Sequence, residues 1–82
     1  MKIIYDEGKR LSNLDTHGLD FADLTIEFFA ACVVIPAKSG RFMAIGAFYG
    51  RIIIAVVFRP VGAEALSVIS MRPASIRERR VL

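Results

Sequence analysis

Very few side chains in this chain of 82 residues could carry out acid–base or metal chemistry. His17 is the only histidine and Cys32 is the only cysteine. An imidazole has an unperturbed pKa of about 6.5, so His17 could take up or release a proton near neutral pH. Cys32 stands between apolar neighbours with no cation to lower its pKa, which is typical of a core cysteine. No ligand spacing supports a zinc site, and we expect no metal ion and no other cofactor.

The positive charge of the chain is concentrated at its C-terminal end. The net charge is +3, and residues 72–82 alone carry four arginines against one glutamate. Residues 1–71 contain equal numbers of basic and acidic side chains, so they contribute no net charge. Such a cluster attracts polyanions such as nucleic acid or an acidic protein surface. An equally good explanation is a solvent-exposed last helical turn, where cations are favourable near the helix C-terminus.

The composition predicts one small folded domain over residues 1–82. Hydrophobic residues make up 55% of the chain and the mean hydropathy is +0.52, which excludes intrinsic disorder. A single cysteine excludes an intrachain disulfide. Apolar runs such as residues 52–58 are too short to span a bilayer, and no apolar stretch typical of a secretion signal follows Met1. We therefore expect a cytoplasmic protein without membrane contact, whose apolar surplus forms a partner surface or a homodimer.

The first half of the chain predicts one strand and two helices, over residues 2–5, 7–17 and 21–31. Asp6 is suited to cap the first helix, and Gly18 is suited to end it because glycine adopts a positive φ without strain. Leu11 and Leu14 share one face of this helix. Asp20 is the N-cap candidate for the second helix, whose apolar residues recur with the spacing of an amphipathic helix.

The second half predicts four strands and a last helix, over residues 32–35, 41–48, 52–58, 64–70 and 74–82. The turns between the strands are predicted at residues 38–40, 49–50 and 60–62. Gly46 within a strand indicates a bulge or a close backbone approach, and Pro73 is suited to end the last strand. Short turns favour antiparallel pairing. We therefore expect an α+β fold in which a small antiparallel sheet of four or five strands packs against two N-terminal helices, with a short C-terminal helix.

Three parts of the chain, taken together, resemble the BrnT family in order and spacing. They are Tyr5-Asp6-Glu-Gly-Lys9 with Asn13-Leu-Asp-Thr-His17-Gly18 and Asp20-Phe21, then Ala44-Ile-Gly46 with Gly50-Arg-Ile-Ile-Ile, then Ile69-Ser70-Met-Arg72-Pro-Ala-Ser-Ile-Arg77-Glu78-Arg79. BrnT proteins are toxins of type II toxin–antitoxin pairs. The resemblance implies a RelE-like ribonuclease fold, metal-independent RNA cleavage and neutralisation by a BrnA-like antitoxin.

The chain departs from the family pattern in a few places. Thr16 and Pro73 stand where the family usually has lysine. No aromatic residue follows Arg79, and the acidic stretch before the strand around Gly46 is shortened to residues 36–40. Loss of one charge donor from a site of this kind can lower the rate on the order of 10²-fold. The hypothesis that follows from these departures is an attenuated ribonuclease.

The resemblance also implies a role for each candidate residue in RNA cleavage. In this reaction the 2′-OH attacks the neighbouring phosphate, which requires proton transfer and cations for the charge that develops on phosphorus. Proton transfer is assigned to His17. Phosphate contact is assigned to Arg59 and Arg72, since a guanidinium binds two phosphate oxygens at once. We expect these three side chains to surround one cavity. The additional RNA-binding cations are Lys9, Arg77 and Arg79.

Each assignment has a purely structural alternative. His17 beside a helix end is often only a favourably placed cation. Arg59 can protect a sheet edge against aggregation, and Arg72 can be a solvated strand end. Asn13 is better explained as a structural hydrogen-bonding residue than as a catalytic group. Tyr49 fits a turn, although RNA bases do stack on exposed aromatic rings.

Two other functions compete with an endoribonuclease. One is a catalytically weak or inactive binding module of the same fold, which interacts with an antitoxin or nucleic acid. The other is a small interaction protein that self-associates through its apolar surplus. An antitoxin would cover the basic site with acidic and apolar residues of a helical segment. BrnT-like proteins pair with ribbon-helix-helix antitoxins, so we expect direct DNA binding of the partner and not of this chain.

Overall fold

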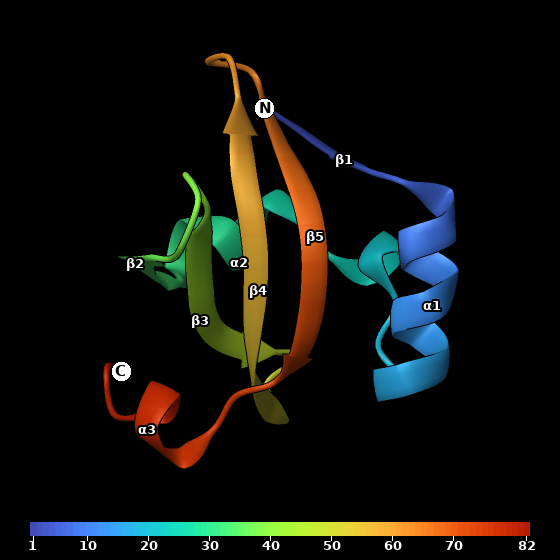
Figure 1. The fold of residues 1–82 in the computed structure, drawn as a ribbon. Helices are drawn as coiled ribbons and strands as arrows, with labels where there is room; N and C mark the ends of the chain where they lie inside the picture. Colours follow the sequence, from blue (N-terminus) through green and yellow to red (C-terminus); the bar gives the residue numbers. More distant parts are fainter.

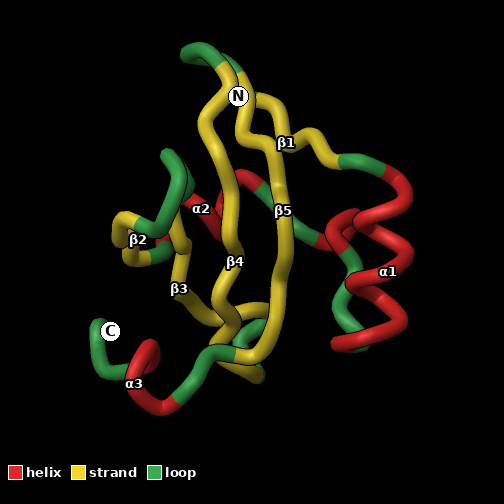
Figure 2. The backbone as a smooth tube through the Cα atoms, in the orientation of Figure 1, coloured by secondary structure: helices red, strands yellow, loops and turns green.

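A five-stranded sheet forms the framework of the structure, a computed structural model that describes residues 1–82. The strands are β1 (Lys2–Tyr5), β2 (Val33–Pro36), β3 (Phe42–Phe48), β4 (Ile52–Val61) and β5 (Ala65–Pro73). The helical elements are α1 (Glu7–His17), the 3₁₀ turn η1 (Phe21–Asp23), α2 (Ile26–Ala31) and α3 (Ile76–Arg79). Figures 1 and 2 show the strand order β1-β5-β4-β3-β2 with α1 beyond the β5 side of the sheet. The predicted α+β class is confirmed.

The sheet is mixed, so the prediction of a purely antiparallel sheet was wrong in one strand. β2 to β5 pair antiparallel with their neighbours along the chain. β1 pairs in parallel with the first part of β5, with Lys2 opposite Ala65 and Tyr5 opposite Val68. Antiparallel pairing follows from short turns only where a turn joins the two strands. β1 is followed by helices, so nothing local decides its neighbour or its direction.

The predicted helix over residues 21–31 is two separate elements. Leu24 has an extended backbone with ψ of 140°, and it separates η1 from α2. The Thr25 hydroxyl then accepts a hydrogen bond from the N–H of Phe28 at 3.2 Å and starts a new helix. A threonine side chain offers this capping bond more readily than it supports a helix interior. The apolar spacing across the break misled the prediction because both pieces bury residues on the same core.

The last turn and the last helix also differ from the prediction. β4 continues through Pro60 and Val61, and the chain turns at residues 62–64. β3 begins opposite Phe58, so this end of β4 is paired on one side only, where a proline is tolerated in a strand. The predicted helix over residues 74–82 is a single turn, α3. Its Ile76 is 73% exposed, so no buried apolar face extends the helix.

One face of the sheet carries the hydrophobic core. Phe21 and Phe28, from η1 and α2, pack with side chains of the three central strands such as Val56, Phe58 and Met71. Figure 1 shows α2 behind the sheet on this side. Gly46 is a close approach and not a bulge, because an added Cβ would lie 3.2 Å from the Cβ of Cys32. The bulge lies in the pairing of β4 with β5, between Val57 and Phe58.

The other face of the sheet, here called the open face, carries the alternate residues of the same strands. Ala55, Val57 and Arg59 of β4 lie on it, since Ile54, Val56 and Phe58 point into the core. By register, this face also presents Arg72, which is opposite Ala55, and Ser67, which is opposite Arg59. Figure 1 shows α3 on this side of the sheet, at one end. The open face therefore carries two of the predicted phosphate-binding arginines.

Candidate functional site

Helix α1 turns a polar stripe toward β5. Lys9, Ser12, Asn13, Thr16 and His17 recur at intervals of three and four residues, so they share one face of the helix. The helix is bounded as predicted, by an Asp6 side chain that accepts from the Lys9 N–H at 2.9 Å and by Gly18 with φ of 69°. Leu11 and Leu14 lie on the solvent side instead and are 53% and 36% exposed.

Asn13 fastens this helix to the sheet. Its side-chain amide donates to the backbone oxygen of Met71 at 2.9 Å and to that of Leu19 at 3.1 Å. Its side-chain oxygen accepts from the backbone N–H of Met71 at 3.1 Å. β1 pairs with β5 only as far as Val68, so the amide of Asn13 satisfies the open edge of β5 where β1 has ended. The predicted structural role of Asn13 is confirmed.

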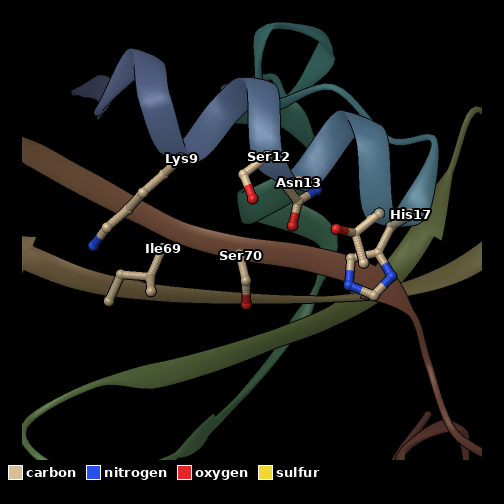
Figure 3. Close-up of a pocket in the computed structure, with 7 residues that line it drawn as sticks. Lys9, Ser12, Asn13, His17, Ile69 and Ser70 are labelled. Carbon is tan, nitrogen blue, oxygen red and sulfur yellow. The ribbon is translucent and has the colours of Figure 1, made fainter.

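A shallow pocket lies between α1 and β5. It has a volume of about 290 Å³, and its lining residues come from the polar stripe of α1 and from the bulged part of β5: Lys9, Ser12, Asn13, Thr16, His17, Ile69 and Ser70. Figure 3 shows the side chains of Lys9 and His17 reaching from α1 toward β5, at opposite ends of the stripe. Both are exposed, while Asn13 between them is buried. The pocket therefore opens to solvent with its two basic groups accessible.

This arrangement suits an anionic ligand that needs proton transfer. The Lys9 ammonium supplies a positive charge, and the His17 imidazole supplies a group that can accept or donate a proton. The hydroxyls of Ser12 and Ser70 make no hydrogen bond to another group of the chain. They are therefore free to bind a ligand. No carboxylate lines the pocket. A phosphate group matches these features in charge and in hydrogen bonding.

Arg72 is held by a carboxylate on the open face. Its Nη1 and Nη2 atoms donate to the two carboxylate oxygens of Glu78, each at 2.7 Å. This pairing lowers the pKa of Glu78 to about 2 and raises the pKa of Arg72 above its ordinary value. Glu78 is fixed in turn by a capping box with Ser75 at the start of α3. Arg72 therefore stands in a defined orientation and outside the α1–β5 pocket.

Arg59 is exposed at the other end of the sheet. It is opposite Ser67, whereas the neighbour of Arg72 on β4 is Ala55, four residues away. Four strand residues span about 13 Å. The structure therefore does not bring His17, Arg59 and Arg72 around one cavity, because His17 lines the α1–β5 pocket and neither arginine does. Their roles in catalysis stay predictions.

The remaining predicted cations are divided between the two regions. Lys9 lines the pocket beside His17. Arg77 and Arg79 lie on α3 and are exposed. The chain holds no group of three or more His, Cys, Asp or Glu side chains that could hold a metal ion. None of its helices is both long and apolar enough to cross a membrane.

Several residues of the site were not predicted from the sequence. Ser12, Ser70 and the Glu78 partner of Arg72 were not singled out, and Thr16 was noted only as a departure from the family. The pocket side of α1 could have been predicted from the sequence. Its polar residues recur every three or four positions, so they had to share one face of the helix. Arg10 also has an unexpected role, since it donates to Asp20 at 3.0 Å and joins α1 to η1. The Ala22 N–H and Arg10 lower the pKa of Asp20.

Comparison with known proteins gives a match to a family model and to solved structures. A family model described as the ribonuclease toxin BrnT of type II toxin–antitoxin systems matches residues 5–78. Among solved structures, the chain is similar to the 1.1 Å crystal structure of the Brucella abortus ribonuclease toxin BrnT. The two have 67% sequence identity and a TM-score of 0.88, over 92% of this chain and 97% of the other. None of the curated proteins compared with the chain matches it. The region that matches the family model contains the whole α1–β5 pocket and the Arg72–Glu78 pair.

Proposed function

Because the chain belongs to the BrnT family of ribonuclease toxins from type II toxin–antitoxin systems, we propose that it cleaves RNA in the α1–β5 pocket without a metal ion. The observation that carries this proposal is the exposure of Lys9 and His17 in one pocket. These two side chains supply a proton-transfer group and a phosphate counter-charge in the same small volume. Residues 1–82 would act as one BrnT-like domain with a RelE-like fold.

The proposed reaction exchanges one phosphorus–oxygen bond for another. His17 accepts the proton of the 2′-OH, and the 2′-oxygen attacks the neighbouring phosphorus. The bond from phosphorus to the 5′-oxygen breaks, and the imidazolium returns its proton to that oxygen. The products are a 2′,3′-cyclic phosphate and a free 5′-OH. Lys9 offsets the negative charge that develops on the phosphate, and the Ser70 hydroxyl donates a hydrogen bond to it.

The arginines outside the pocket are assigned to the RNA on either side of the cleaved bond. Arg59 and Arg72 stand on the open face, and Arg77 and Arg79 follow on the same side at α3. A strand of RNA that leaves the pocket can contact these groups through its phosphates, since single-stranded RNA is bound along positively charged tracks. In this assignment His17 alone transfers protons.

The departures from the family pattern support attenuated activity. Thr16 lines the pocket beside His17, at a position where the family usually has lysine. A lysine there would bring a second ammonium group next to the scissile phosphate. Its absence favours slow cleavage, or, as the second candidate function, RNA or antitoxin binding without cleavage. The rest of the pocket does not depend on Thr16, because that residue makes no side-chain hydrogen bond.

The proposed partner is a BrnA-like antitoxin that covers the basic groups. Arg59, Arg72 and the half-buried apolar residues Met43 and Val57 give the open face both charge and hydrophobic area. This composition fits a partner segment with acidic and apolar side chains. Exposed apolar residues such as Val34 on edge strand β2 also support a homodimer as a second form of association. An RNA substrate would place the activity in the cytoplasm.

A cleavage assay with the purified chain and single-stranded RNA tests the proposal. His17→Ala should lower the cleavage rate by about 10²-fold or more, because it removes the proton-transfer group. Asp15→Ala is the matched control, since Asp15 is an exposed residue of α1 that does not line the pocket. The products should carry 2′,3′-cyclic phosphate ends, and a chelator should leave the rate unchanged. Full activity in His17→Ala would refute the assignment, and RNA binding without any cleavage would favour the second function.

A further inference from the structure

The pair formed by Arg72 and Glu78 uses only part of the guanidinium. Arg72 presents Nη1 and Nη2 to the two oxygens of Glu78, each at 2.7 Å, and Nη1 also donates to the Pro73 oxygen at 3.3 Å. A guanidinium has five N–H groups. The two that stay free, one on Nε and one on Nη2, lie on the same edge of the group. The Arg72 side chain is 34% exposed. Its Nε atom makes no hydrogen bond and is accessible to solvent, since Arg41 Nε is the buried side-chain nitrogen that lacks a partner.

Glu78 is held firmly enough to orient the guanidinium. Its Oε1 atom accepts from the Ser75 N–H at 2.8 Å, while its own N–H donates to the Ser75 hydroxyl at 3.1 Å. The preceding segment is fastened to the sheet, because the Ala74 N–H donates to the Ile53 oxygen at 2.9 Å. The Glu78 side chain is only 17% exposed, so it is more enclosed than the arginine that it binds.

We propose that Glu78 is a positioning residue, which holds the end of the Arg72 guanidinium so that its free Nε–Nη2 edge can bind an RNA phosphate with two hydrogen bonds. The inference rests on the proposed ribonuclease function and on the phosphate contact assigned to Arg72. An arginine fork binds phosphate best when its orientation is set before the ligand arrives, because fewer side-chain rotations are lost on binding. A carboxylate on one edge leaves the other edge available, so the pair does not block phosphate binding.

Two variants separate this role from a merely structural one. Glu78→Gln removes the charge of the pair but keeps the capping box, since glutamine serves at this position as well as glutamate. Ser75→Ala removes the hydroxyl that accepts from the Glu78 N–H, but it keeps both groups of the pair and the backbone N–H of residue 75 that donates to the Glu78 carboxylate. Cleavage of single-stranded RNA should be slower in Glu78→Gln by about 10-fold in kcat, because misorientation of a phosphate-binding group raises the barrier. Ser75→Ala should stay within about two-fold of the natural chain.

A double-mutant cycle with Arg72→Ala tests whether Glu78 acts through Arg72. If it does, Glu78→Gln should cause no further loss in a chain that already carries Arg72→Ala. Two results would overturn the inference. One is an equal loss of cleavage rate in Ser75→Ala and Glu78→Gln, and the other is additive losses of cleavage rate in the double-mutant cycle. Faster cleavage by Glu78→Gln would also overturn it, because Glu78 would then compete with the phosphate. Normal cleavage by Arg72→Ala would refute the contact at Arg72 while His17→Ala still reports on the ribonuclease itself.

Binding provides a second measurement that does not require cleavage. The probe is a fluorescent 2′-O-methyl oligoribonucleotide, which cannot be cut at the 2′-oxygen, and the readout is its anisotropy at fixed salt. Glu78→Gln raises the net charge of the chain from +3, so electrostatic attraction alone would tighten binding. Positioning predicts the opposite, a several-fold weaker affinity that approaches the value for Arg72→Ala. Tighter binding by Glu78→Gln would contradict the inference even in a chain with no measurable activity.

Discussion

Replacement of Asn13 by alanine should destabilise the whole domain, because one amide satisfies three backbone groups. The substitution leaves the Met71 N–H and the Met71 carbonyl without partners. Asn13 is 8% exposed and Met71 is fully buried, so water cannot easily replace the lost bonds. A buried polar group without a partner costs about 1–3 kcal/mol. Two such groups lower the free energy of unfolding by about 2–6 kcal/mol, a large part of what a domain of this size has.

Urea unfolding followed by far-ultraviolet circular dichroism measures this loss. The midpoint of thermal unfolding should fall on the order of 15 °C, since each kcal/mol shifts a small domain by about 4–8 °C. Ser12→Ala is the matched control, because Ser12 is its exposed neighbour on the same stripe and makes no side-chain hydrogen bond. A loss below about 0.5 kcal/mol in Asn13→Ala would refute the account of how α1 is attached to β5.

The variant Asn13→Asp adds a test of the direction of the hydrogen bonds. An ionised carboxylate accepts only, so it can bind the Met71 N–H but repels the oxygens of Met71 and Leu19. Burial and these oxygens should raise the pKa of the introduced carboxyl. The loss in free energy of unfolding, relative to the natural chain, should therefore grow as the pH rises from 4 to 7 and become smaller again on acidification. A deficit that does not change with pH would show that the carbonyls are not close neighbours.

Three further predictions follow from particular contacts. Thr16→Lys should raise the rate of RNA cleavage on the order of 10²-fold in a single-turnover assay, because it adds a charge donor to the pocket, and an unchanged rate would count against attenuation. The pairing with Arg72 lowers the pKa of Glu78 from 4.5 to about 2, so its stabilisation is full above about pH 5 and is lost as the pH falls toward 2. After allowance for solvent screening the loss is about 1 kcal/mol, and urea unfolding at several pH values should show it in the natural chain but not in Glu78→Gln. Gly46→Ala should cost about 1–3 kcal/mol by thermal unfolding, since its Cβ would lie 3.3 Å from Phe28, and a neutral effect would mean that α2 can move away from the sheet.

The α1–β5 pocket divides the predicted cationic groups, since it includes Lys9 and His17 but neither Arg59 nor Arg72. The pocket combines His17 with Lys9 from the same helix, two turns apart. Arg59 and Arg72 lie on the open face, and neither lines that pocket. Proton transfer is therefore assigned to the pocket, and RNA attachment to the arginines outside it. A variant of Arg59 should accordingly weaken RNA binding more than it slows the chemical step.

Residues near one another in the sequence determined the elements that were predicted correctly. Asp6 and Gly18 bound α1 because a capping side chain and a positive φ act within one helical turn. Tyr49 and Gly50 form the turn between β3 and β4 with φ values of 53° and 63°. The local capping by Thr25, which divides the predicted second helix, was equally present in the sequence, but the apolar spacing outweighed it.

The sequence by itself determined where most strands and helices lie and which residue types could act on RNA, because backbone preferences and side-chain chemistry belong to individual residues. Only the tertiary structure decided that β1 joins β5 in parallel and that the polar stripe of α1, with Asn13 at its centre, faces the sheet. It also decided that Arg72 meets Glu78 while Arg59 stands apart. Each of these outcomes depends on contacts between segments distant in the chain. Such contacts form only when the burial of the whole core selects one arrangement over its competitors.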